Sequence, residues 1–157
     1  MIKFLGKYRK WVSSVINERL LGVRGLVYEL DTPDFYRPQK LQFIFSNTEK
    51  LFSLMCSKDG SSLVLTDSPI QESDLGEYGK EVIMDLSNIT LFIDYIGKRL
   101  LEIYSIFSSV EDAFMGIKFV FEGDLNLIIV NFGDEINIFN SLPSSYEHDE
   151  GIKYQSL

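Results

Sequence analysis

The chain repeats one pattern of apolar segments and turns, first over residues 19–69 and again over residues 99–143. Each copy opens with Arg-Leu-Leu and passes through two strongly apolar segments to a turn that contains Asp and Gly. It then closes with a short apolar segment followed by Ser and Pro. The separation between matching residues drifts only from about 80 to about 73, which is typical of a repeated structural unit. Hairpins with Asp and Gly turns also resemble one another by chance, and the sequence leaves that alternative open.

The repeated segments are short, apolar and rich in β-branched and aromatic residues, which predicts β-strands. Residues 2–18 carry apolar side chains at helical spacing, which predicts an amphipathic helix that packs on a sheet or lies on an anionic membrane. We therefore expect an α+β fold, in which an N-terminal helix precedes an antiparallel β-sheet built from two similar four-strand meander units. Residues 81–98 leave room for a short strand at residues 82–84 and for one short helix, capped by Ser87 or Asn88, between the units.

The length and the charge of the chain restrict what it can be. With 157 residues, 45% of them hydrophobic, residues 1–157 are expected to form a single domain. The net charge is −8, although residues 1–25 hold six basic residues against one acid. An acidic body repels phosphate backbones, so we expect no nucleic-acid partner and an attraction to basic proteins. Acidity that serves solubility alone is the alternative.

Targeting signals and disulfides are not expected. The single cysteine, Cys56, cannot form a disulfide within the chain, which fits a reducing compartment. No uninterrupted apolar run is long enough to span a membrane, and Lys7, Arg9 and Lys10 interrupt the place where a signal peptide has its apolar core. We therefore expect a cytoplasmic protein without a membrane partner.

The residue types that most often carry chemistry are scarce. The only histidine, His148, lies among acids near the C-terminus, where a solvated side chain is the usual outcome. Two Cys and His residues in the whole chain are too few for the usual zinc sites, and no glycine-rich phosphate loop occurs. We therefore expect no enzyme activity, catalytic residue, metal or cofactor. The carboxylate pairs Glu122/Asp124 and Asp134/Glu135 could serve as acid and base, but both fall in predicted turns.

Acidic turns and the acidic C-terminal segment are the candidate binding surface. Carboxylates there would complement a basic partner, with Tyr146 or Tyr154 as aromatic anchors, and a plain solvated surface is the alternative reading. The turns at residues 122–124 and 133–135 are expected at opposite ends of their strands. The candidate partner-binding residues are Glu122, Asp124, Asp134, Glu135, Tyr146, Glu147, Asp149 and Glu150.

Residues 116–138 run as a strand, a glycine turn, a second strand that ends in Asn, the sequence Gly133-Asp134-Glu135, and a third strand. This segment resembles a pattern found in small bacterial immunity proteins, which neutralise polymorphic toxins that include those of contact-dependent growth inhibition. The resemblance implies a protein that binds a cognate toxin domain and neutralises it by occlusion, and it does not identify the toxin's activity. Because an acidic inhibitor would capture a basic protein quickly, a basic nuclease is the expected class. The three motif residues would serve the turn itself.

Two other function classes remain open. The first is a non-enzymatic adaptor or homodimeric assembly module that uses an exposed strand edge. The second is a small hydrolase that uses the acidic residues.

Overall fold

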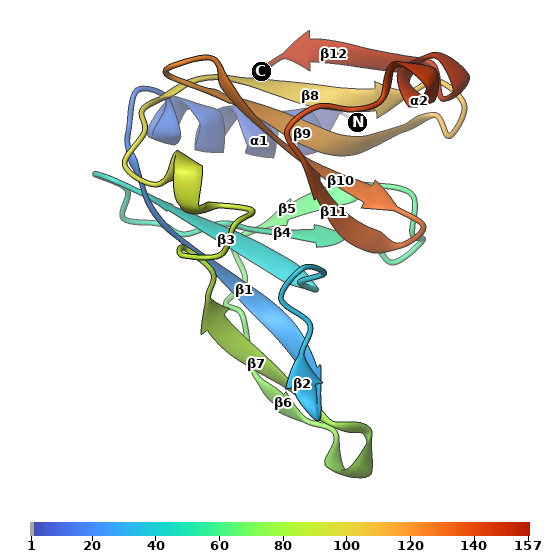
Figure 1. The fold of residues 1–157 in the computed structure, drawn as a ribbon. Helices are drawn as coiled ribbons and strands as arrows, with labels where there is room; N and C mark the ends of the chain where they lie inside the picture. The colour runs from blue at the N-terminus through green and yellow to red at the C-terminus, as the bar shows by residue number, and fades with distance from the viewer. Residues whose placement is uncertain (1) are drawn as a thin grey trace.

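The computed structural model describes residues 2–157, and it describes side chains from residue 6 onward. Two antiparallel sheets make up most of the molecule (Figure 1). The first sheet contains, in spatial order, β5 (Leu63–Thr66), β4 (Ser53–Cys56), β3 (Lys40–Phe45), β1 (Leu20–Leu30), β7 (Lys80–Asp85) and β6 (Ser73–Asp74), with β2 (Thr32–Pro33) also paired to β1. The second contains β11 (Glu135–Phe139), β10 (Leu125–Phe132), β9 (Ala113–Phe121), β8 (Leu100–Ser108) and β12 (Ile152–Ser156).

Helices contribute little to the described part of the chain. They are α1 (Ile2–Val15), the short α2 (Ser144–Asp149) and the 3-10 turns η1 (Gly76–Tyr78) and η2 (Ile93–Tyr95). With 47% of the residues in strands, the fold is mostly antiparallel β, and the predicted α+β class is wrong. The predicted single sheet is wrong as well, because the two meanders lie in separate sheets. Within residues 2–157, no helix combines the length and apolarity that crossing a bilayer requires.

The two segments that share a sequence pattern also share a hydrogen-bonding register. Strands β1-β3-β4-β5 and β8-β9-β10-β11 each form a four-stranded antiparallel meander. Matching ladder positions hold similar side chains, so the second and third pairings of each meander align Leu41 with Leu54 with Leu65 in one sheet, and Ile117 with Ile129 with Ile138 in the other. The first pairing of each meander even shifts register at the same place, just after Leu20 and just after Leu100.

The meanders meet where each of them begins. Arg19 and Arg99 form an antiparallel bridge, and the hydrogen bonds around it come in matched pairs. The Leu20 N–H donates to the Lys98 carbonyl at 3.0 Å, and the Leu100 N–H donates to the Glu18 carbonyl at 2.9 Å. From this seam, defined as residues 17–20 and 97–100, the two chains diverge into different sheets.

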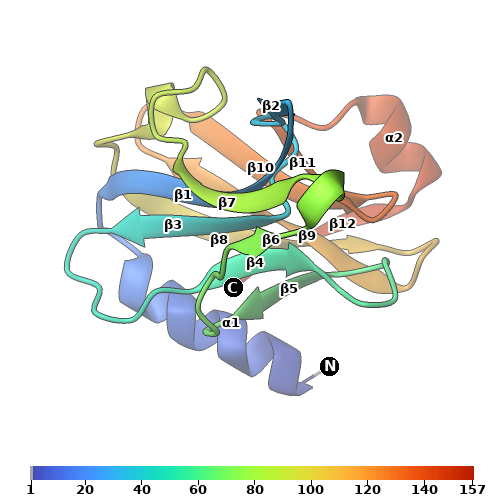
Figure 2. The ribbon, with the colours of Figure 1, turned by 90° about the horizontal axis from the view of Figure 1, so that it is seen from below.

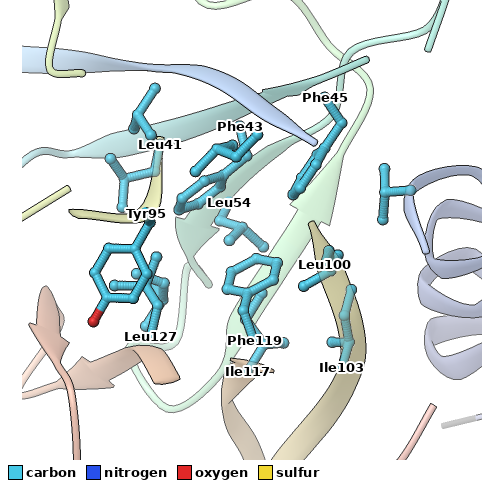
Figure 3. Packing of buried hydrophobic residues seen from close by; sticks show 14 of the residues in the cluster. Leu41, Phe43, Phe45, Leu54, Tyr95, Leu100, Ile103, Ile117, Phe119 and Leu127 are labelled. Carbon is cyan, nitrogen blue, oxygen red and sulfur yellow. The ribbon is translucent and has the colours of Figure 1, made fainter. Parts of the chain in front are cut away.

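Large apolar side chains fill the space between the sheets (Figure 3). Phe119 on β9 is fully buried, and its ring lies 4.9 Å from that of Phe43 on β3, between centroids. Helix α1 adds Trp11, which meets Phe119 edge-on at 5.8 Å, and Tyr8, whose hydroxyl donates to the Leu63 carbonyl at 2.9 Å. The described apolar side chains of α1 therefore pack on the core, and Figure 2 shows the helix running along the β5 side of the first sheet.

We expect replacement of Phe119 by alanine to remove the contact that joins both sheets and α1. Truncating a fully buried Phe costs about 3–5 kcal/mol of unfolding free energy, because apolar burial is lost and a cavity remains. Urea unfolding followed by circular dichroism measures this loss. The control is Leu101→Ala, since Leu101 is 43% exposed on the neighbouring strand, and equal effects of the two substitutions would contradict this account of the core.

Candidate functional site

Glu122, one of the predicted binding residues, is bonded to two residues of the seam. Its Oε1 accepts a hydrogen bond from the Arg99 N–H at 3.2 Å and from Arg19 Nη1 at 3.2 Å. The bond from the Arg99 backbone and the nearby Arg19 guanidinium lower the pKa of Glu122. Glu122 is thus engaged within the fold, at the point where the two meanders join. Asp124, in the same turn, is exposed and adopts a φ of 58°.

The acids at residues 134 and 135 lie at the other end of β10. Eight residues of strand separate the two turns, which corresponds to roughly 25 Å. One compact cluster of all the predicted acids therefore does not form. Gly133 and Asp134 both have positive φ, at 57° and 64°, as a two-residue hairpin turn requires. The Asn131 side chain accepts from the Asp134 N–H at 3.0 Å and donates to the Ser62 carbonyl at 2.9 Å, which ties this turn to the β4–β5 hairpin.

Most of the predicted C-terminal residues hold α2 and β12 in place. The Tyr146 ring packs 4.5 Å from that of Phe132, and partial burial raises the pKa of Tyr146 to about 12. Glu147 accepts from the Tyr154 hydroxyl at 2.6 Å, and Glu150 accepts from Ser108 Oγ at 3.2 Å. Asp149 is exposed. Tyr146 and Tyr154 are therefore partly occupied by internal contacts.

Two hollows flank the 133–135 turn. One, of about 420 Å³, is lined by Gly133 together with Tyr146 and Glu150. The other, of about 410 Å³, is lined by Asp134 and Glu135. The structure therefore brings together four of the predicted residues around one turn, and separates them from Glu122 and Asp124.

The second hollow also contains Cys56. Burial, and secondarily the negative charges of Asp134 and Glu135, raise the pKa of the Cys56 thiol to about 11. Cys56 occupies the ladder position in the first meander that Asn131 occupies in the second, since it pairs with Leu63 as Asn131 pairs with Ile136.

A further concave surface lies elsewhere, on an arm formed by the end of β1 with β2, β6, η1 and β7. This arm projects away from the rest of the molecule (Figure 1). Its groove has a volume of about 800 Å³, and five carboxylates and one lysine are among the residues that line it. The charged lining residues are Glu29, Asp31, Glu72, Asp74, Glu81 and Lys80.

Apolar side chains are exposed on the same arm. Tyr78 is 70% exposed, Leu30 is 50% exposed and Leu75 is 40% exposed. Tyr36, in the loop that follows β2, is 59% exposed. Isolated exposed apolar residues are ordinary on protein surfaces, but several on one projection with acids between them are typical of a binding surface.

Sequence reasoning missed the arm because residues 68–80 are polar and acidic, and such segments usually form solvated loops. The one usable signal was that Leu75 and Tyr78 each stand directly before a glycine in an acidic segment. Gly79 has a φ of 94°, and a Cβ there would come within 2.4 Å of the Glu29 carbonyl oxygen. This close approach sets the hairpin tip against the end of β1.

Comparison with known proteins adds no relative: no protein-family model, no curated protein and no solved structure gives a significant match. Among residues 2–157, no group of three or more His, Cys, Asp or Glu side chains is arranged to hold a metal ion.

We expect the raised pKa of Cys56 to slow its alkylation. A shift from 9.0 to about 11 leaves about one hundredth of the usual thiolate fraction at about pH 8. The rate with iodoacetamide should therefore keep rising up to about pH 10 instead of levelling near the ordinary thiol pKa. Asp134→Asn with Glu135→Gln should raise the rate at pH 8 only in part, because burial is the larger cause. Asp149→Asn is the matched control, and a rate that levels near pH 8.5 would contradict the assignment.

Proposed function

We propose that this chain is an immunity protein that binds a cognate bacterial toxin domain and neutralises it by occlusion. The expected toxin class is a basic nuclease, and the expected place of action is the cytoplasm. The chain supplies no chemistry in this scheme, because covering the toxin's active site or its substrate path is sufficient. The resemblance of residues 116–138 to immunity proteins suggests the class, and the distribution of charge supports it.

The observation that carries the proposal is the excess of carboxylates that the chain leaves unneutralised. The sequence holds 23 acidic and 15 basic residues. Among the described side chains only four ion pairs form, and each of them joins exposed or partly exposed groups. An uncompensated negative surface accelerates encounter with a basic protein, and this steering weakens as salt screens it.

The motif residues support the proposal through the fold and not through contact. Gly133 and Asp134 build a hairpin turn, and Asn131 ties that turn to the first sheet. The resemblance to immunity proteins would then be a likeness of scaffold. The surface that contacts the toxin would lie on segments outside the motif.

We expect co-expression with the toxin domain encoded by an adjacent gene to rescue cell growth. Cells carrying the toxin domain alone should lose viability, and cells that also make this chain should grow at the normal rate. In vitro, the affinity of the purified pair should fall as salt is raised from low to physiological concentration, because charge complementarity contributes. Equal killing with and without this chain would contradict the proposed function. An affinity that stays the same as salt is raised would contradict the contribution of charge complementarity to binding.

A homodimeric assembly module is the second candidate, and strand β12 is the observation that favours it. Within the described chain β12 pairs only with β8, so its outer edge has no strand partner. Residues 153–156 on this edge are exposed. Such an edge can pair with a second copy, although Lys153 on it is a common device against pairing. Sedimentation at high protein concentration decides this alternative, because a strictly monomeric species excludes it.

A further inference from the structure

The arm combines a groove with exposed apolar residues at its tip. The tip is the η1 hairpin, which carries Leu75 and Tyr78, and Leu30 lies beside it on β1. Residues 29–31, 72–74 and 80–82 form most of the groove between them. Figure 1 shows the tip at the far end of the molecule from α2 and β12, clear of both sheets' shared core. A partner can therefore reach it without displacing any other element.

The groove has an unbalanced negative charge. Its one lysine, Lys80, is already paired with Glu29 at 3.3 Å. Two of its acids are used to fix the backbone, since Asp74 accepts from the Gly76 N–H at 2.9 Å and Glu72 accepts from the Ile83 N–H at 2.9 Å. Asp31 and Glu81, by contrast, make no side-chain hydrogen bond or ion pair with the described residues. Their charges remain available to a partner.

Contacts between β1, β7 and the η1 hairpin hold the arm in one conformation. The Tyr28 hydroxyl donates to the Tyr78 carbonyl, and β7 pairs with β1 along its length. A Cβ at Gly79 would come within 2.4 Å of the Glu29 carbonyl oxygen, so the hairpin lies close against the end of β1. A binding surface that is already ordered loses less conformational entropy on association, which favours affinity.

We propose that this arm is the docking surface for a basic, arginine-containing segment of a partner protein. Guanidinium groups suit the site because they pair with carboxylates in two places at once and also stack on aromatic rings. Arginines of the partner segment would pair with Asp31 and Glu81 in the groove. Apolar side chains that lie between those arginines in the partner segment would cover Leu75 and Tyr78. Nucleic acids and anionic membranes are disfavoured occupants, because the groove's carboxylates repel phosphate.

The inference deepens the proposed function and rests on it for the identity of the partner. If the chain neutralises a basic toxin domain, the arm is the part that enters or covers the toxin's basic surface. The chemistry of the groove, however, can be tested with a defined peptide and without any toxin.

The experiment titrates the full-length, ¹⁵N-labelled protein with a short synthetic peptide that interleaves Arg with Leu and Ser. A matched peptide with Glu in place of every Arg is the control. We expect amide shift changes to concentrate at residues 29–31 and 72–82 with the basic peptide, and to be absent with the acidic one. Changes that concentrate at residues 133–150, or no saturable binding even at low salt, would overturn the proposal.

The peptide affinities of single-site and double variants show which side chains contribute to binding. Tyr78→Ala, and Asp31→Asn combined with Glu81→Gln, should each weaken peptide binding by about tenfold, as removal of a central aromatic or charged contact does. Val110→Ala, at a side chain that is 64% exposed elsewhere, and Asp149→Asn should leave the affinity unchanged. Retained amide shifts outside the arm show that each variant is folded. Equal affinities across all four variants would overturn the proposal.

The co-expression assay separates this inference from the proposed function. If the wild-type chain protects cells and Tyr78→Ala protects them equally well, the arm is not the docking surface, although the proposed function stands. If the peptide maps to the arm and the wild-type chain gives no protection, the docking surface stands and the proposed function fails.

Discussion

The backbone bridge between Arg19 and Arg99 is the constraint on which the rest of the structure depends. Two meanders of the same register begin there and turn away into separate sheets, so that their apolar faces enclose one core. The seam is polar as well as bonded through the backbone, because Glu122 draws Arg19 to the same place. Helix α1 precedes the seam in the sequence. Its described apolar side chains pack on the core between the two sheets.

The two halves share a scaffold and differ in what is attached to it. The segment between the meanders adds β6 and β7 to the first sheet, and the segment after the second meander adds β12 to the second sheet. Strands β7 and β12 occupy the same place, each next to the first strand of its meander, whereas β2 and β6 have no counterpart among the described strands of the second sheet. Since connecting segments on a rigid scaffold are the usual place for binding functions, these additions are where the halves would differ in role. The arm, which contains β2 and β6, also has the groove of about 800 Å³.

The sequence revealed the buried strands more readily than the exposed ones. Residues such as Leu41, Phe43 and Phe45 alternate or cluster as buried strands do, and all three are buried in the structure. By contrast β12 exposes residues 153–156, and β6 is only two residues long, so neither carries an apolar pattern that could be detected. Their pairing is decided by neighbouring strands and not by their own side chains. The α+β expectation was wrong for this reason, because strands were undercounted at both places.

The predicted site residues show a similar division. The turn at Gly133 and Asp134 follows from local backbone chemistry, which a sequence displays. The pairing of Glu122 with Arg19 joins residues 103 positions apart, and Tyr146 on α2 lies against Met115, which belongs to strand β9. Such contacts form only when the chain folds, so the spacing of residues in the sequence does not predict them. For the same reason the groove on the arm, which combines residues near 30 with residues near 80, could not be foreseen.

The tip of the arm is fastened by its backbone and by one glycine, whereas its outward side chains touch nothing in the core. Leu75 and Tyr78 can therefore be exchanged for other residues at little cost to folding. A molecule built this way can change the partner it recognises through a few substitutions in one hairpin, while the two-sheet body remains as it is. Gly79 is the exception, because any side chain there would collide with the backbone of β1 and displace the hairpin that we propose as the docking surface.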